Sequence, residues 1–468
     1  MHRTISLALG LSLALAATSP VAAQQTEPPA PGTPHDFSVP EPREFTLANG
    51  LEVVFVPYGT IPKVSILLTT RVGNVNEAAD EVWIADLTAD LMEVGTTTRT
   101  AEQIAAEAAQ MGGSLNIGVG STQTTVSGEV LAEFGPQMVH LIADVAQNPS
   151  FPESELPRLK ADRVRQIAIA RSRPQSLAAE KFAAVMYVNH PYGRTFPSPE
   201  MVQGFTIEEI RGFYNENFGA ARSRLYIVGR FDAAAMEQAV RDAFGQWRRG
   251  TVGTRNVPTP TTRRVIYIVD RPGSVQSTIF LGLPVIDPSN EDWVELQVAN
   301  TLLGGAFSSR ITSNIREDKG YTYSPFSSVN ARYRDAYWME SADVTTNVTG
   351  PSLKEIFYEI DRLQSEPPTR EELRGIQNYM AGIFVLQNST RGGITNQLNF
   401  MRVHGLPDEY LNTYVQQIYD VTPQEVSAAV NEYLDDERMT IVIVGDRAQI
   451  IEQVKPFGEI VDEGEALP

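Results

Sequence analysis

Two stretches far apart in the chain follow the same pattern: LYIVGRFDAAAMEQAVRDAFG at residues 225–245 and TIVIVGDRAQIIEQVKPFGEI at residues 440–460. Each has a buried-strand pattern that ends in a glycine, followed by an amphipathic helix pattern that ends in Phe-Gly. The two strand-ending glycines are 216 residues apart. A second pair of similar strings, at 151–164 and 368–380, precedes them in the same order. We infer a duplicated unit of roughly 200 residues.

Within the first unit, the predicted strands and helices come in groups. Strands are predicted where apolar residues alternate or run together, and helices where they recur every three or four residues. The strands are expected at 51–56, 64–71, 115–120 and 123–130, and the helices at 81–93, 101–111, 133–147 and 153–172. Helices grouped between antiparallel strands indicate an α+β fold, here as two homologous tandem domains that each pack an antiparallel-rich sheet against helices.

The composition excludes several classes of protein. The chain has 468 residues, with 38 Lys and Arg against 57 Asp and Glu, a net charge of −19. An acidic chain without a basic block is not expected to bind nucleic acid or an anionic membrane. The absence of cysteine excludes disulfides, thiolate-bound metals and thiol catalysis. No two of the five histidines lie three or four residues apart, so no helical histidine pair can hold a metal ion.

The N-terminus has the features of a secretory signal at residues 1–23. A short basic start precedes a 13-residue, mostly apolar run at 5–17, which is too short to span a membrane, and small residues follow. We expect a bacterial periplasmic protein without a membrane span. The other predicted segments are a Pro-rich, mobile lead-in at 24–42, a first domain at 43–250, a linker at 251–262, a second domain at 263–458 and a frayed acidic tail at 459–468.

A series of strings in a fixed order resembles the pitrilysin/insulinase-type metallopeptidases, a family that includes the mitochondrial processing peptidase. In the first half the strings are FTLANGLEVVFVP (45–57), EVGTTTRTAEQIA (93–105), GGSLNIGVGSTQTTVSG (112–128) and HPYGRTFPS (190–198). In the second half they are LLGGAFSSRITSNIREDKGYTYS (302–324) and VHGLPDEYLNTYVQQIYDVTPQEV (403–426). The resemblance covers residues 43–458 and implies that the two domains form half of a clamshell.

The resemblance also implies that the zinc site of the family is lost. Active members carry His-x-x-Glu-His on the first long helix, where both His bind zinc and the Glu is the general base, and a distant Glu completes the site. The matching positions are Asp86, Ala89, Asp90 and Gln166. Two carboxylates and an amide bind zinc weakly, and losing the base costs about 10²–10⁴-fold in rate. We expect no cofactor in this chain and an Asp86–Asp90 face that is solvated or paired with arginine, with a cation site as the alternative.

Arg316 and Tyr323 match a second functional element of the family. In the relatives, an Arg and a Tyr seven residues apart reach the substrate near the cleaved bond, and the string around them is intact here. A tyrosine hydroxyl can donate a hydrogen bond to a developing oxyanion, and a guanidinium can hold a carbonyl. The alternative is a surface arginine beside a tyrosine that packs in the core.

The string at residues 112–128 resembles the edge strand that binds substrate in the family. An exposed edge can accept an extended peptide as another strand, and simple sheet structure is the alternative. The candidate peptide contacts are Gly113, Leu115, Asn116 and Ile117.

Three hypotheses follow for function. The leading one is a non-catalytic subunit of a secreted two-chain zinc endopeptidase, inactive alone, which supplies Arg316 and Tyr323 to a zinc-bearing partner of the same family. The unfolded peptide substrate would be enclosed between the two chains. The second is a structural or peptide-binding scaffold without a role in peptide cleavage. The third is an independently active hydrolase with a changed metal.

Overall fold

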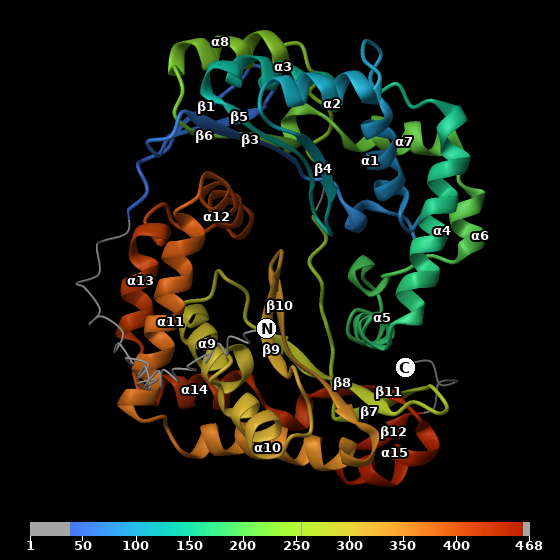
Figure 1. The fold of residues 1–468 in the computed structure, drawn as a ribbon, viewed down its shortest axis with the longest axis vertical. Helices are drawn as coiled ribbons and strands as arrows, with labels where there is room; N and C mark the ends of the chain where they lie inside the picture. Colours follow the sequence, from blue (N-terminus) through green and yellow to red (C-terminus); the bar gives the residue numbers. More distant parts are fainter. Residues whose placement is uncertain (1–37, 254, 462–468) are drawn as a thin grey trace, which may run out of the picture. The chain divides into compact units, whose positions relative to one another are not determined.

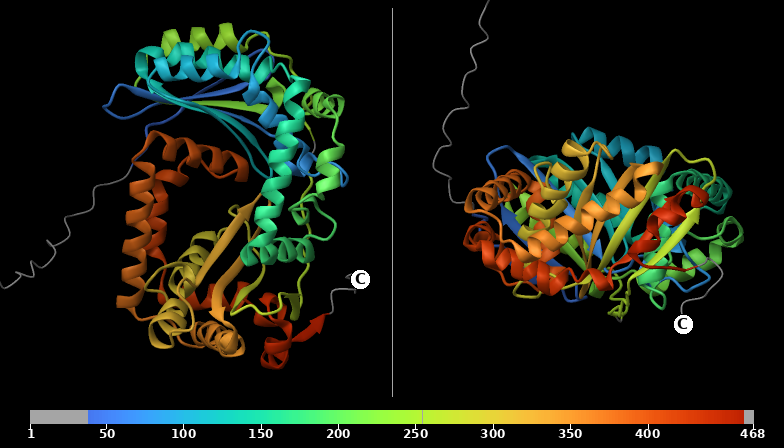
Figure 2. Two further views of the ribbon diagram at one scale, coloured as in Figure 1. Left: turned by 45° about the vertical axis from the view of Figure 1, so that its right-hand side comes forward. Right: turned by 90° about the horizontal axis from the view of Figure 1, so that it is seen from below.

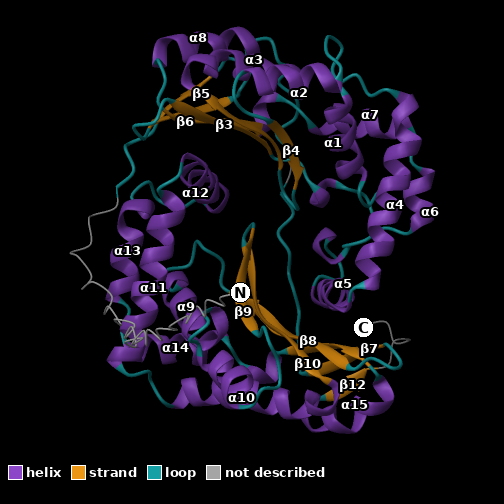
Figure 3. Ribbon diagram, viewed as in Figure 1, coloured by secondary structure: helices purple, strands orange, loops and turns teal. Residues whose placement is uncertain are grey.

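The computed structural model describes residues 38–253 and 255–461, which contain two six-stranded mixed sheets (Figures 1 and 3). The first sheet has the order β1-β2-β6-β3-β5-β4, and the second has the order β12-β7-β11-β8-β10-β9. The strands of the first sheet are β1 (Arg43–Thr46), β2 (Glu52–Pro57), β3 (Lys63–Thr70), β4 (Leu115–Val119), β5 (Thr124–Leu131) and β6 (Ser223–Gly229). Those of the second are β7 (Val265–Asp270), β8 (Gln276–Val285), β9 (Phe326–Arg332), β10 (Asp335–Thr345), β11 (Thr440–Gly445) and β12 (Glu459–Val461).

Five of the six strands follow the same order in both sheets, which confirms the expected α+β fold with two homologous halves. The outermost strands differ, since β1 is antiparallel to β2 whereas β12 is parallel to β7. Most neighbouring strands are antiparallel, and the parallel pairs are β2 with β6, β7 with β11 and β7 with β12. The central strands β6 and β11 are buried along their whole length, because helices cover both faces of the sheets. Their burial explains the continuous apolar runs that the two repeated strings have in common.

Helices follow the strands in the same sequence in each half. The helices of the first half are α1 (Ile84–Val94), α2 (Ala101–Gln110), α3 (Gly135–Gln147), α4 (Leu156–Ser172), α5 (Pro174–Met186), α6 (Pro199–Gly204), α7 (Ile207–Asn217) and α8 (Ala233–Phe244). Those of the second are α9 (Trp293–Asn300), α10 (Thr349–Ser365), α11 (Arg370–Asn388), α12 (Arg391–His404), α13 (Tyr410–Asp420), α14 (Pro423–Tyr433) and α15 (Arg447–Val454). None of the helices within the described ranges is both long and apolar enough to cross a membrane.

Each half lends one helix to the sheet of the other half. The helix α5 packs on β8 and β11 of the second sheet, and α12 packs on β3 and β6 of the first sheet (Figure 1). The opposite face of the first sheet is covered by α3 and α8 (Figure 2). Two mixed aliphatic and aromatic clusters, one under each exchanged helix, bury the contacts between the halves. Residues 38–253 and 255–461 therefore belong to one compact unit.

The observed elements differ from the predicted ones at a few boundaries. The helix expected at 81–93 begins at Ile84, because Trp83 has a left-handed backbone with φ of 74° and stops the helix from extending backwards. Residues Glu459–Val461, expected as the start of a frayed tail, form β12 because Ile460 and Val461 pair with β7. In the Pro-rich lead-in, Val39 is buried and its N–H donates to Asn412 at 3.0 Å. The predicted signal and most of the lead-in lie outside the described residues.

Candidate functional site

The positions that match the zinc motif lie on α1 and α4, which contact each other. Leu87 and Leu91 anchor α1 in the core. Asp86 and Asp90 lie one helical turn apart beside this apolar face, because residues four apart share one side of a helix. Ala89 is buried at 6% exposure and has no group that can accept a proton.

The guanidinium of Arg163, on α4, lies where the three polar positions of the motif converge. It forms a two-pronged contact with Asp90, from Nε to Oδ2 and from Nη2 to Oδ1, both at 2.7 Å. Its Nη1 donates to Asp86 Oδ1 at 3.0 Å and to Gln166 Oε1 at 3.3 Å. The charged ends are mostly withdrawn from water, with side-chain exposures of 15% for Arg163, 19% for Asp86 and 25% for Asp90. One guanidinium therefore satisfies all three side chains at the former ligand positions.

The electrostatics of this cluster follow from partial burial. Burial acts to lower the pKa of Arg163, but the hydrogen bonds and charges of Asp90 and Asp86 outweigh it and raise that pKa. Burial raises the pKa of Asp86, while Arg163 and a hydrogen bond from Asn74 oppose the rise. Arg163 thus stays charged and offsets one of the two negative charges of the acidic pair.

The residues at this position do not fit a zinc ion. Zinc at hydrolytic sites takes His nitrogen together with a carboxylate, whereas the donors here are two carboxylates and an amide. Their oxygens are already engaged by a permanent cation that stands where a metal would have to bind. Within residues 38–253 and 255–461, no group of three or more His, Cys, Asp or Glu could hold a metal ion.

The sequence analysis missed Arg163 and Glu77. A charge-balance argument could have identified Arg163, since a partly buried acidic pair requires a cation and Arg163 lies one turn before Gln166. Glu77 is 5% exposed, and its Oε1 accepts the N–H of Ala85 in the first turn of α1 at 3.1 Å. Burial raises the pKa of Glu77 from about 4.5 to about 7, although hydrogen bonds from Trp83, Asn74 and Ala85 act to lower it.

Glu77→Gln is expected to remove a loss in the free energy of unfolding that the wild type shows as the pH rises from 4.5 to about 7. The pKa of Glu77 is higher in the folded than in the unfolded state, so its contribution is fully present below pH 4.5 and is lost as the pH rises to about 7. The wild type should lose about 3 kcal/mol relative to the variant across this window, because one pKa unit corresponds to about 1.4 kcal/mol. Urea unfolding from pH 4.5 to 8 measures the difference. The exposed Glu133→Gln is the control, and parallel curves for wild type and Glu77→Gln would contradict the expectation.

The predicted peptide-binding strand is β4, an edge strand of the first sheet. Gly113 precedes it and packs closely on β5, where an added Cβ would lie 2.0 Å from the carbonyl oxygen of Glu129. Leu115 and Asn116 line a pocket of about 470 Å³ with Glu93 and small residues of α2. Burial raises the pKa of Glu93, and the nearby backbone N–H of Ile117 opposes the rise. A peptide that added to this edge would therefore meet the Glu93 carboxylate.

Arg316 and Tyr323 are brought together on the second half of the chain. Arg316 lies on the π-helical turn η7 (Thr312–Asp318), and Gly320, with φ of 65°, reverses the chain after it. The guanidinium carbon of Arg316 lies 5.1 Å from the ring centre of Tyr323 and 4.3 Å from that of Phe307. Phe307, which the sequence analysis missed, thus forms the other wall of an aromatic clamp around Arg316.

Tyr323 is 81% exposed and Phe307 is 69% exposed, so the alternative of a core tyrosine does not hold. The only ion pair of Arg316 among the described residues is a 3.4 Å contact with its neighbour Glu317. Tyr323 is therefore open to solvent, and the Arg316 side chain is partly open at 22% exposure. No hydrogen bond or ion pair within the described ranges joins them to the Asp86–Arg163 cluster.

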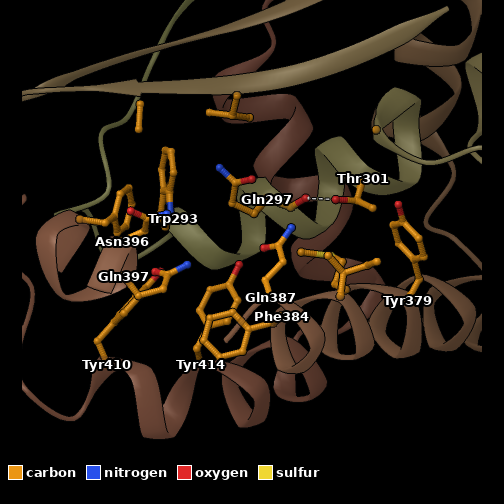
Figure 4. Close-up of a pocket in the computed structure, with 16 residues that line it drawn as sticks. Trp293, Gln297, Thr301, Tyr379, Phe384, Gln387, Asn396, Gln397, Tyr410 and Tyr414 are labelled. Atoms are coloured by element: carbon orange, nitrogen blue, oxygen red, sulfur yellow. Dashed lines mark hydrogen bonds between the residues drawn. The ribbon is translucent and has the colours of Figure 1, made fainter. Parts of the chain in front are cut away.

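A pocket of about 510 Å³ lies among α9, α11, α12, α13 and the edge strand β9 (Figure 4). Its walls combine aromatic rings, such as Trp293 and Tyr414, with the side-chain amides of Gln297, Gln387 and Gln397. None of the side chains that line it is charged. Such a lining suits uncharged groups that can both stack and exchange hydrogen bonds with amides.

The fold and the altered ligand set define a metallopeptidase-like chain that lacks its own zinc donors. Two family models match in succession: "Insulinase (Peptidase family M16)" at residues 53–200 and "Peptidase M16 inactive domain" at residues 204–380. The chain belongs to the insulinase, or M16, peptidase family. The inactive-domain match supports a non-catalytic subunit.

Relatives and solved structures agree with this family. A protein of Mycobacterium bovis named an uncharacterized zinc protease is 27% identical over 410 residues, which are 84% of this chain and 91% of the relative. One of Rickettsia felis with the same description is 28% identical over 292 residues, 62% of this chain and 70% of the relative. A peptidase M16 inactive domain from Pseudomonas fluorescens has the same fold, with a TM-score of 0.79 at 22% identity over 86% of this chain and 97% of that one. A protease from Helicobacter pylori matches with a TM-score of 0.80 at 20% identity, over 87% of this chain and all of that one.

Proposed function

We propose that this chain is the non-catalytic subunit of a secreted, periplasmic two-chain zinc endopeptidase. A partner of the same family would carry the zinc ion, its His and Glu ligands and the general base. This chain would form half of the peptide chamber and supply Arg316 and Tyr323 to the substrate. The observation that best supports this proposal is a combination of two features in one chain. The guanidinium of Arg163 occupies the position of the family's zinc ion, and Arg316 and Tyr323 lie together with Tyr323 exposed.

The guanidinium of Arg163 supports the first part of the proposal. Because it already engages Asp86, Asp90 and Gln166, a metal ion would have to displace a paired cation from a partly buried position. Ala89 supplies no base even if a metal bound. Peptide hydrolysis would thus need zinc and a base from another polypeptide.

The clamp of Phe307, Arg316 and Tyr323 supports the second part. Two exposed aromatic rings flank one guanidinium here, and adjoining exposed apolar side chains beside a polar group are typical of an interaction site. The tyrosine hydroxyl can donate to the oxyanion of a tetrahedral intermediate, and the guanidinium fork can hold a carbonyl of the peptide.

Reconstitution tests the proposal. The purified chain is to be mixed with a family member from the same organism that retains His-x-x-Glu-His, and cleavage of an unfolded peptide is measured. We expect no cleavage by this chain alone, and chelator-sensitive cleavage by the mixture that greatly exceeds the activity of the partner alone. A partner whose general-base Glu is replaced by Gln is the control. Stoichiometric zinc and chelator-sensitive cleavage by the isolated chain would refute the proposal.

The second candidate is a peptide-holding scaffold. It is favoured by the edge strand β4 with its adjoining pocket of about 470 Å³ and by the uncharged pocket beside β9. A scaffold would bind unfolded peptide alone, and Glu93→Ala would strengthen binding because it removes a carboxylate from beside the N–H of Ile117. Titration of a labelled extended peptide onto the isolated chain distinguishes this candidate from a subunit that acts only in the assembled enzyme.

A further inference from the structure

A cavity of about 310 Å³ between the first sheet and α12 concentrates positive charge in a chain whose net charge is −19. Residues from β3, β6, the segment between the halves and α12 contribute to its wall, and α12 packs on both of these strands. Its charged lining consists of Arg71, Arg222, Arg224, Arg255, Arg402 and a single acidic residue, Glu52. None of the described residues that line this cavity belongs to the zinc motif or to the Arg316–Tyr323 pair.

Two of the five arginines have carboxylate partners. Glu52 bridges them, with Oε2 at 3.2 Å from Arg224 and Oε1 at 2.6 Å from Arg402. Arg224 is also paired with Glu44. Glu44 and Glu52 thus pair with Arg224 and Arg402, and within the described ranges neither forms an ion pair with the other three arginines.

The other three arginines contact only neutral groups among the described residues. Arg71 donates to the carbonyl oxygen of Ala221 at 3.2 Å, and Arg222 donates to carbonyl and amide oxygens of Asn217, both at 2.9 Å. The guanidinium carbon of Arg255 lies 4.1 Å from the ring centre of Tyr333. Burial and the nearby charges of Arg255 and Arg402 lower the pKa of Arg71, and Glu52 only partly opposes them. Burial and Arg71 lower the pKa of Arg222, and Glu216 only partly opposes them. These like charges destabilise one another unless a counter-charge is present.

Two residues that line this cavity, and also an adjacent pocket beside β2, carry buried donors without a partner in the described part of the chain. The Nε of Arg224 and the hydroxyl of Tyr226 are both buried and have no hydrogen-bond partner among the described residues. Arg224 is 9% exposed and Tyr226 is 1% exposed, and both line the cavity. An unpaired buried donor costs about 1–3 kcal/mol, so such groups in a native structure call for an acceptor.

We infer that this cavity binds a small multivalent oxyanion, either a di- or tricarboxylate or a phosphate ester. Three guanidiniums without a direct carboxylate partner among the described residues favour a ligand with more than one negative charge, and guanidinium forks match the geometry of carboxylate and phosphate oxygens. A volume of about 310 Å³ admits a small molecule or an acidic peptide end, but no folded segment. The same oxyanion chemistry could come from a free metabolite or from the carboxylates of a bound peptide.

Calorimetric titration of the full chain at low ionic strength tests the inference, with citrate and inorganic pyrophosphate as free anions. A third probe is a short peptide ending in Asp-Glu, compared with its amidated Asn-Gln analogue. We expect at least one probe to bind, to raise the unfolding temperature and to weaken steeply with added salt. Binding of citrate or pyrophosphate assigns the site to a free anion, and binding of the acidic peptide alone assigns it to a peptide.

Arg71→Gln and Arg255→Gln should each weaken binding about 10–100-fold, because each removes a charge-assisted contact. The ligand-free variants should be at least as stable as the wild type at low salt, since each substitution relieves repulsion within the cavity. Arg158→Gln, an exposed position on α4, is the matched change in charge and should leave binding unaltered. Absence of binding by every probe, or equal affinities for wild type and both cavity variants, would overturn the inference without affecting the proposed endopeptidase role.

Discussion

Tyr323→Phe is expected to lower kcat/KM of the reconstituted two-chain enzyme about 10²–10³-fold, the usual effect of removing one oxyanion donor. The ring stays in place and keeps its 5.1 Å contact with Arg316, so only the hydroxyl is lost. Because that hydroxyl would act on the transition state, the loss should appear in kcat with little change in KM.

Arg316→Ala should differ from Tyr323→Phe in its kinetic signature. Removing the guanidinium takes away a contact to the bound peptide and also the group that lies between the rings of Phe307 and Tyr323, so KM should rise together with a fall in kcat. Arg316→Lys keeps the charge but loses the fork and should recover only part of the activity. Tyr358→Phe, a half-exposed tyrosine on α10, is the matched control. Full activity in both Tyr323→Phe and Arg316→Ala would exclude a shared active site.

Arg163→Met is expected to destabilise the isolated chain by about 3–5 kcal/mol, which is typical when one partner of a buried ion pair is removed. Methionine has a similar length and fills the space of the aliphatic stem, so the loss reports on charge rather than on a void. Asp86 and Asp90 would then face each other one turn apart without a cation, each mostly shielded from water. Denaturant unfolding at pH 7 measures the effect.

Two controls separate charge from packing in this experiment. Adding Asp86→Asn and Asp90→Asn to Arg163→Met should recover most of the lost stability, because the unpaired charges are gone. Arg158→Met removes an arginine on the same helix whose partners are exposed, and it should cost at most about 1 kcal/mol. If Arg163→Met unfolds at the wild-type denaturant concentration, the guanidinium does not hold the cluster together. In either result the variant should not gain stoichiometric zinc, since no imidazole is present.

The amino-acid sequence alone determined the duplication, the α+β fold and the loss of the zinc ligands. Periodic apolar residues give the buried runs of β6 and β11, because a strand covered on both faces excludes polar side chains from water. The loss of His, Glu and a base at Asp86, Ala89, Asp90 and Gln166 is a fact of composition that folding cannot reverse. The sequence did not predict two local features: the left-handed backbone of Trp83 and the pairing of Ile460 with β7.

Only the tertiary structure decided what replaces the metal and where charge accumulates. Arg163 meets Asp86 and Asp90 across more than 70 residues of chain, and Glu52 meets Arg402 across 350. Sequence spacing does not predict such pairs, because the distance between the side chains depends on how α1 packs against α4 and how α12 packs against the first sheet. The exposure of Tyr323 likewise depends on a reversal at Gly320 that seven-residue spacing does not specify. The sequence thus gives the chemical groups of each side chain. Which charges lie beside a side chain, and how far it is exposed to water, is decided only by long-range packing.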